Sequence, residues 1–137
     1  MNHEQAVDEI LDMFRVAWQT TGHQAFYEQV REDRNSAITP WAEVFIRHSG
    51  GFQGSIGEKG HRKFVRIGFI RVTIQTPAVF GLSSRYQLAK VVADAYEGKS
   101  SASGGVWFRN VRINEGERDG MFYGLNVIVD FQYHETK

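Results

Sequence analysis

The stretch MFYGLNVIVDFQY, residues 121–133, has the most regular pattern in the chain and decides the fold. Every second side chain in it is apolar or aromatic: Met121, Tyr123, Leu125, Val127, Val129, Phe131 and Tyr133. The residues between them are mostly polar. A period of two with one apolar face is typical of an antiparallel strand that buries one side. The stretch therefore predicts a long sheet strand packed on a core.

Three further strands are expected upstream of this one. Residues 106–113 predict a strand, and NEGERDG (114–120) predicts the turn into the last strand. Residues 41–48 alternate between apolar and mixed side chains, which also indicates a strand. The β-rich run 64–75 changes its apolar parity midway, so either both faces are partly covered or a bulge lies near Gly68.

Two segments have helical periodicity instead. Residues 3–19 place their apolar side chains on one helical face, and Asn2 with Gln5 fits a capping box. Residues 82–97 show the same period, with Leu88, Val91, Val92, Ala95 and Tyr96 as the expected inner face. Between the first helix and the strand at 41–48, residues 25–30 could be extended and 32–40 resemble a loop.

The expected fold class is therefore α+β, with a mainly antiparallel sheet and two helices packed on one face. The predicted element order is α-β-β-α-β-β, and residues 1–137 are expected to form a single domain. With 42% apolar and 13% aromatic residues the chain has enough material for one core.

Composition excludes several classes of protein. The formal net charge is zero, so no global field attracts nucleic acid or an anionic membrane. There are no cysteines, which excludes a disulfide scaffold and thiolate metal sites. No run approaches the roughly 18 apolar residues of a membrane span, and the start does not resemble an export signal. A soluble protein used without export is expected.

The stretch TPAVFGLSSRYQLAK (76–90) raises the question of a serine nucleophile, because a strand, a glycine turn, a serine and a helix follow one another. A nucleophile elbow needs G-x-S-x-G directly after the strand. Here Arg85 stands where the second glycine should be, and seven residues separate the strand from Ser83. Ser84 with Gln87 matches a capping box instead, so we expect a helix start.

No catalytic, cofactor or metal site is predicted. The five histidines share no short ligand spacing, and Asp130 and His134, on one strand face, would be about 13 Å apart. The segment Gly54 to Lys63 lacks the helix and the Lys-Ser/Thr of a phosphate-binding loop. It is expected to be a mobile surface loop or a loop that orders against an acidic partner. Basic residues alternate with aromatic ones around Lys63–Phe69, but the RNA-recognition signature is absent.

Some apolar side chains fall where a monomer gains little from them. Phe52, Val79 and Phe80 lie in segments marked by glycine or proline. The second face of the last strand is mixed rather than fully charged; it carries Phe122, Asn126, Ile128, Asp130, Gln132 and His134. Clustered exposed apolar groups usually mark contacts, so we expect this chain to meet other chains.

Five features together resemble a known family. They are the helix at 3–19, the extended FYEQV (26–30), the strand entry PWAEVFI (40–46), the passage VTIQTPAVFGLSSRYQLAKVVADAYEG (72–98) and the closing hairpin GGVWFRNVRINEGERDGMFYGLNVIVDFQY (104–133). In order and spacing the chain resembles the tail terminator, or tail completion, proteins of long-tailed bacteriophages, the lambda U-like group.

The resemblance implies a structural protein without enzymatic activity. It implies a homo-oligomer, a hexameric ring at the head-proximal end of the virion tail, made in the host cytoplasm during assembly. The ring caps the tail tube, stops its polymerisation and offers a surface to the head–tail connector protein. The candidate interface residues are Phe52, Lys59, His61, Arg62, Lys63 and Phe80. Alternatives are another neck or head–tail joining protein, or a small enzyme with a pocket between sheet and helices that uses Glu43 or Asp130.

Overall fold

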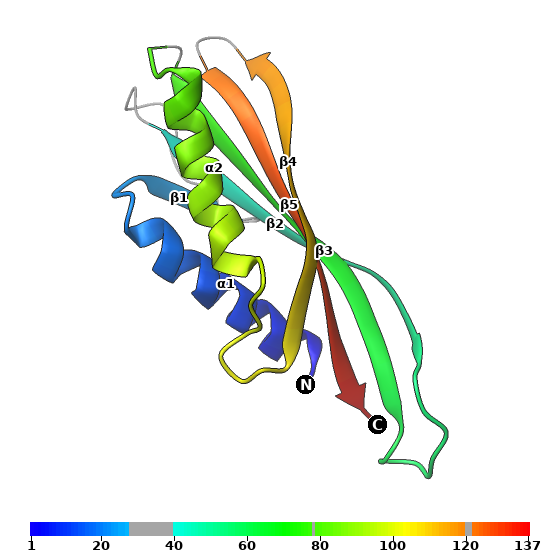
Figure 1. Cartoon of the computed structure of the whole chain (residues 1–137). Helices are drawn as coiled ribbons and strands as arrows, with labels where there is room; N and C mark the ends of the chain where they lie inside the picture. Colours follow the sequence, from blue (N-terminus) through cyan, green and yellow to red (C-terminus); the bar gives the residue numbers. More distant parts are fainter. Residues whose placement is uncertain (28–39, 78, 120–121) are drawn as a thin grey trace.

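The computed structural model describes residues 1–27, 40–77, 79–119 and 122–137, without the side chains of 117–119. Its elements are α1 (His3–Gln19), β1 (Gln24–Tyr27), β2 (Trp41–Gln53), β3 (Lys63–Pro77), α2 (Leu82–Tyr96), β4 (Val106–Asp119) and β5 (Phe122–Thr136). The strands form one sheet in the order β1-β2-β3-β5-β4, and both helices lie on one face of it (Figure 1). The α+β prediction is confirmed.

The short strand β1 is an addition to the predicted order. It pairs with β2 in parallel, from Gln24 opposite Trp41 to Tyr27 opposite Val44, while all other strand pairs are antiparallel. It covers the first half of the segment 25–30 that was expected to be extended. The rest of that segment, and the loop expected up to residue 39, lie outside the described residues.

Helix α1 begins as its sequence predicts. The Asn2 side chain accepts a hydrogen bond from the Gln5 backbone N–H at 2.8 Å, and the Gln5 side chain accepts one from the Asn2 N–H at 3.0 Å. The helix turns Ala6, Ile10, Phe14 and Trp18 inward, at the spacing of one helical face. The predicted capping box is therefore confirmed.

Helix α2 begins at the residue that its period predicts, but the predicted cap is wrong. The helix begins at Leu82, and its N-cap is Gly81, which has an extended backbone and no side-chain cap. Ser84 lies within the first turn, so the expected Ser84–Gln87 capping box does not form. The reason is that the turn after β3 brings Gly81 into the N-cap conformation two residues before Ser83. The inner face is also shifted, with Ala89, Val92, Ala93 and Tyr96 buried.

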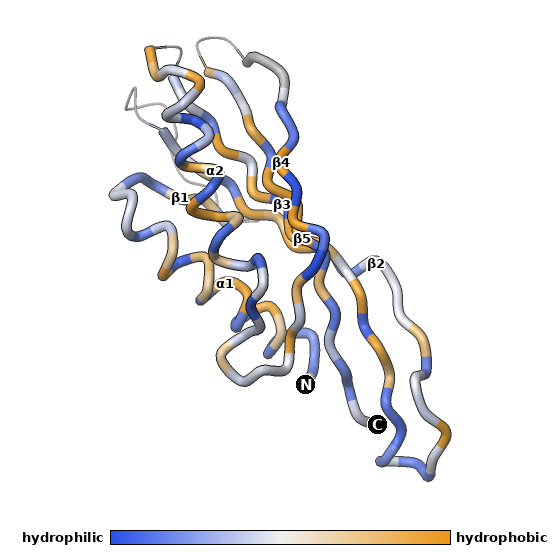
Figure 2. Tube along the Cα trace, viewed as in Figure 1, coloured by the Kyte–Doolittle hydropathy of each residue, from blue (hydrophilic) through white to orange (hydrophobic). Residues whose placement is uncertain are grey.

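The core lies between the helices and the central strands. Strands β3 and β5 pair without a break from Lys63 opposite Thr136 to Pro77 opposite Phe122. The inward side chains of Ile70–Ile74 in β3 and of Leu125–Phe131 in β5 are buried together with those of α1 and α2, and Figure 2 shows the apolar residues concentrated where helices and sheet meet. The alternating stretch of the last strand is thus the centre of the core, as its period predicts.

A bulge marks the point where the sheet leaves this core. It lies in β2, between His48 and Gly50, and not in β3, which stays regular opposite β5. Gly68 faces it on the core side, where an added Cβ would lie 2.2 Å from the Arg47 carbonyl oxygen and 2.5 Å from Cζ of Phe131. Val65 points to the face away from the helices and is nevertheless buried, with 5% of its surface exposed. The change of parity in β3 therefore reflects partial cover on both faces, and the expected bulge near Gly68 lies in the neighbouring strand β2.

Candidate functional site

Beyond the bulge, β2 and β3 continue past the helices as a projecting hairpin, residues 49–67, which we call the arm (Figure 1). The strands pair from Gly50 opposite Ile67 to Gln53 opposite Phe64. The end of β5 runs beside them, because Lys63 still pairs with Thr136. The sequence predicted a surface loop from Gly54 to Lys63; in the structure this loop is the end of a hairpin that continues the two central strands.

The tip of the arm, residues 54–62, is held by its own hydrogen bonds. The Gly54 N–H donates to the Lys63 carbonyl at 2.7 Å, and the Arg62 guanidinium Nε donates to the Gly57 carbonyl at 2.8 Å. Arg62 and Lys137 exchange two backbone hydrogen bonds of 2.9 Å. The tip is therefore a defined turn attached to the end of β5.

The surface of the arm combines exposed apolar groups with basic ones. Phe52 is 60% exposed and Ile56 is fully exposed. Lys59, Arg62 and Lys63 are exposed as well, and no carboxylate among the described residues lies within ion-pair distance of them. Exposed apolar side chains stabilise a monomer little, and together with these basic groups they make the arm the candidate contact surface of the chain.

The structure brings together five of the six predicted interface residues and separates the sixth. Phe52, Lys59, His61, Arg62 and Lys63 all lie on the arm. Phe80 is half-buried in the turn before α2, at the opposite end of the molecule (Figure 1). Its carbonyl accepts a hydrogen bond from the Arg85 guanidinium at 3.2 Å. Phe80 therefore does not belong to the same surface.

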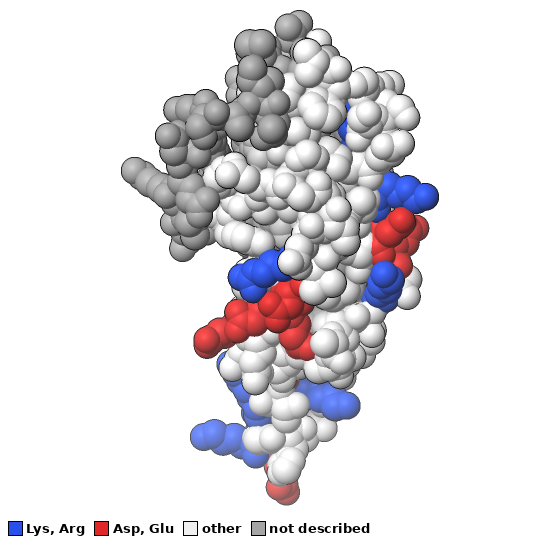
Figure 3. Space-filling view, turned by 90° about the vertical axis from the view of Figure 1, so that its left-hand side faces the viewer, with Lys and Arg blue, Asp and Glu red and all other residues white. Residues whose placement is uncertain are grey.

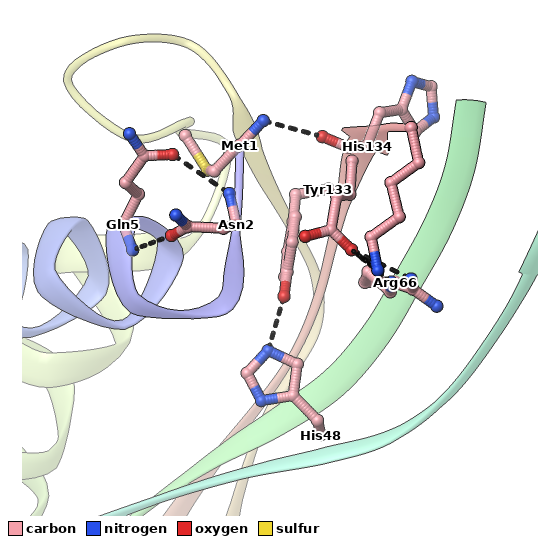
Figure 4. Close-up of polar contacts among 9 residues, drawn as sticks. Met1, Asn2, Gln5, His48, Arg66, Tyr133 and His134 are labelled. Carbon is pink, nitrogen blue, oxygen red and sulfur yellow. Dashed lines mark hydrogen bonds and ion pairs between the residues drawn. The ribbon is translucent and has the colours of Figure 1, made fainter. Parts of the chain in front are cut away.

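A polar and aromatic cluster lies where the arm joins the core (Figure 4). The His48 Nε2 and the Tyr133 hydroxyl share a hydrogen bond of 2.7 Å, and the His3 ring lies 4.2 Å from the His48 ring. Beside them, two guanidinium nitrogens of Arg66 donate to one carboxylate oxygen of Glu135 at 2.9 and 3.1 Å. The cluster joins α1, β2, β3 and β5 at the base of the arm.

The environment shifts the pKa values of this cluster. Burial, with His3 and Arg66 nearby, lowers the pKa of His48, since all three disfavour its charged form. Burial, with a smaller contribution from Glu135, raises the pKa of Tyr133 to about 12. The hydrogen bond from Arg66 lowers the pKa of Glu135. Near neutral pH the cluster therefore holds a neutral imidazole, a neutral phenol and a charged ion pair.

Sequence reasoning missed this cluster because it judged the histidines by their spacing along the chain. His3 and His48 are 45 positions apart in the sequence and meet only through the packing of α1 on the sheet. The alternation of the last strand could have placed Tyr133 and Glu135 on one face. No sequence signal points to His3.

The carboxylates considered for an enzyme do not lie between sheet and helices. By register, Glu43 and Asp130 are on the outer face, opposite the helices. Asp130 accepts a hydrogen bond from the Asn110 side chain at 3.1 Å and lies 3.4 Å from an Arg112 guanidinium nitrogen. His134 shares this face, as predicted, and packs against Trp107.

Three further features bear on the function. Among the described residues, no group of three or more histidine, aspartate or glutamate side chains could hold a metal ion. No helix of the described chain is long and apolar enough to span a bilayer. The second face of β5 is half-buried along most of its length and carries no helix (Figure 1).

Comparison with known proteins gives a likeness in fold and none in sequence. No protein-family profile and no curated protein matches the chain. Among solved structures, one whose name gives no function has a TM-score of 0.62 at 13% identity, covering 93% of this chain and 97% of that chain. Another, from the virion of a native gene transfer agent particle, has a TM-score of 0.50 at 15% identity and covers 92% of each chain. At such identities the likeness shows a shared fold.

Proposed function

We propose that this chain is a structural protein of a tailed phage or phage-like particle, and that it serves there as the tail terminator. In this role copies form a ring, expected to be hexameric, at the head-proximal end of the tail. The ring caps the tube protein, stops its polymerisation and presents its other side to the head–tail connector. The function requires neither catalysis nor a cofactor.

The observation that carries the proposal is the fold shared with a chain of a gene transfer agent virion over 92% of both chains. The match extends over most of the chain rather than over one common motif. The order of elements that resembles the lambda U-like proteins supports the same assignment.

The arm gives the proposal a physical basis. A ring built from one kind of subunit needs a donor surface and a different acceptor surface on every copy. The arm projects from the core and carries exposed apolar side chains and basic ones that form no ion pair with the described residues, as a donor surface would. Polymerisation of the tube stops if one side of the ring reproduces the contacts of a tube subunit and the other side does not.

Deleting the gene of this protein from the genome that encodes the particle tests the proposal. Without a terminator, electron microscopy should show tubes of excessive and variable length that carry no heads. Tails of normal length beside separate, filled heads would instead identify a head–tail joining protein. Particles of normal length with heads attached would refute a role at the tail end.

A second measurement tests the ring itself. Native mass spectrometry of the purified protein, mixed with its tube protein, should show six copies of the chain bound together. A chain that stays monomeric beside capped tubes would contradict the ring.

A further inference from the structure

We infer that the tip of the arm of one copy docks into a groove beside α1 of the next copy, head to tail. The inference rests on the proposed function, since it assigns the donor and acceptor surfaces of the ring. The acceptor surface is a part of the chain that the sequence did not single out.

The groove lies between α1 and the segment that follows α2. It has a volume of about 540 Å³ and is lined on its apolar side by Met13, Val16, Ala17 and Ala95. This volume falls within the roughly 300–1,000 Å³ of pockets that hold bulky groups, so it has room for a side chain with part of a turn. Val16 is an apolar residue on the outer side of helix α1, and it is 71% exposed. The groove therefore offers apolar surface that the monomer leaves uncovered.

The charges around the groove are mostly acidic. Helix α1 carries Glu4, Asp8, Glu9 and Asp12 against a single basic residue, Arg15. Glu9 and Asp12 line the groove directly, together with Lys99. The Arg15–Asp12 pair is exposed and i,i+3, so it is a weak contact that a partner can displace.

The end of the arm has the opposite charge, and like the groove it combines an exposed apolar side chain with charged ones around it. Lys59, Arg62 and Lys63 stand against one acidic residue, Glu58, and Ile56 lies fully exposed among them. On the α1 side of the molecule, Figure 3 shows acidic side chains gathered across the middle and mainly basic ones over the narrow lower end. Basic side chains also lie beside the acidic ones in the middle, and an acidic side chain lies at the lower end. An apolar centre within a charged rim, repeated with opposite sign, is the complementarity expected of two surfaces that meet.

The two surfaces lie on different parts of the molecule, so one copy can donate its arm and accept another at the same time (Figure 1). Such a contact is heterologous, and it closes into a ring when its rotation divides the circle. The hydrogen bonds of the tip limit the ordering cost on docking, because the turn is already formed.

Photo-crosslinking from the arm tip tests the inference. Benzoylphenylalanine at position 56, in an equal mixture of isotopically light and heavy copies, should give light–heavy adducts on Met13, Val16 or Ala17. The same group at Val79, which is 83% exposed and off the arm, is the matched control. Adducts of position 56 on another surface, on the tube protein alone, or none between copies up to about 1 mM protein, would overturn the inference.

A charge exchange gives an independent readout. Lys59→Glu with Lys63→Glu should weaken association by about tenfold or more, and Asp8→Lys with Asp12→Lys should do the same, because each places like charges opposite one another. All four side chains are exposed, so the monomer should keep its fold. The chain that carries all four changes should regain association. If the combined chain is weaker than either pair, the two patches do not face each other.

The two proposals can fail separately. A ring with no adduct from position 56 to α1 would overturn this inference and leave the terminator role intact. Adducts on α1 from a chain whose removal leaves tails unchanged would overturn the terminator role alone.

Discussion

Replacing Gly68 with alanine should destabilise the protein more than any other single methyl group added on this hairpin. The added Cβ would lie 2.2 Å from the Arg47 carbonyl oxygen and 2.5 Å from Cζ of Phe131. Both atoms are fixed, one in the backbone of β2 and the other in a ring that is 0% exposed. Neither can move aside without disturbing the bulge or the core.

The magnitude follows from these two contacts. Overpacking a core typically costs 1–3 kcal/mol, and here the obstacles are a backbone atom and a buried ring, so we expect about 3 kcal/mol. For a chain of this size that corresponds to a fall in melting temperature of roughly 10 °C. Urea unfolding followed by circular dichroism should show a lower midpoint with an unchanged slope.

Gly50→Ala is the matched control. It lies in β2 across from Ile67, and its added Cβ would lie 3.8 Å from the nearest Ile67 atom, an ordinary contact. Its unfolding free energy should stay within about 0.5 kcal/mol of the wild type. If Gly68→Ala proves as stable as Gly50→Ala, then Gly68 is not the close contact between arm and core, and the reasoning fails.

Three other changes test the packing and the cluster. Tyr96→Phe should lower the unfolding free energy by about 1 kcal/mol, because the buried hydroxyl donates a hydrogen bond to the Ile10 carbonyl at 2.9 Å. Tyr86→Phe removes an exposed hydroxyl and should change the unfolding free energy little. Equal effects of the two changes in denaturant melts would contradict this. The lowered pKa of His48 means that the unfolded chain binds a proton below about pH 6.5 while the folded chain does not, so stability should fall as pH drops from there. His48→Gln should reduce that slope, and an unchanged slope between pH 8 and 5 would assign it to other groups. Asn2→Ala should lower the unfolding free energy by about 1 kcal/mol through loss of the cap; a thermal melt equal to that of the wild type would contradict this.

The fold could be predicted where side-chain periodicity carries it. Strand β5 and helix α1 bury the residues that their periods of two and 3.6 select. The period also placed the start of α2, but its cap could not be identified, because the N-cap is a glycine, which leaves no side-chain signal. Strand β1, with four residues, is too short to show a period.

The candidate site was less predictable than the fold. The basic residues and Phe52 of the arm were identified by composition, but their common surface depends on the bulge after His48, which resets the parity of β2. Glycine-rich strands give no apolar alternation, so the arm resembled a loop. The groove beside α1 joins the middle of a helix to a segment about 85 residues away, and only the packing of α1 against α2 creates it.

The edges of the sheet explain why copies would associate through arm and groove rather than by strand pairing. Strand β4 is an outer strand of the sheet, and its ladder with β5 is interrupted twice, after Arg109 and after Glu115. Asn110 within the first interruption has a φ of 55°. Such bulges twist an edge and break the row of backbone groups that another strand would need. On the other side, the described part of β1 covers the edge of β2 only from Trp41 to Val44, and the rest of that edge is interrupted by the bulge after His48. A chain built this way resists open-ended sheet growth, and association is left to side-chain surfaces whose geometry can close.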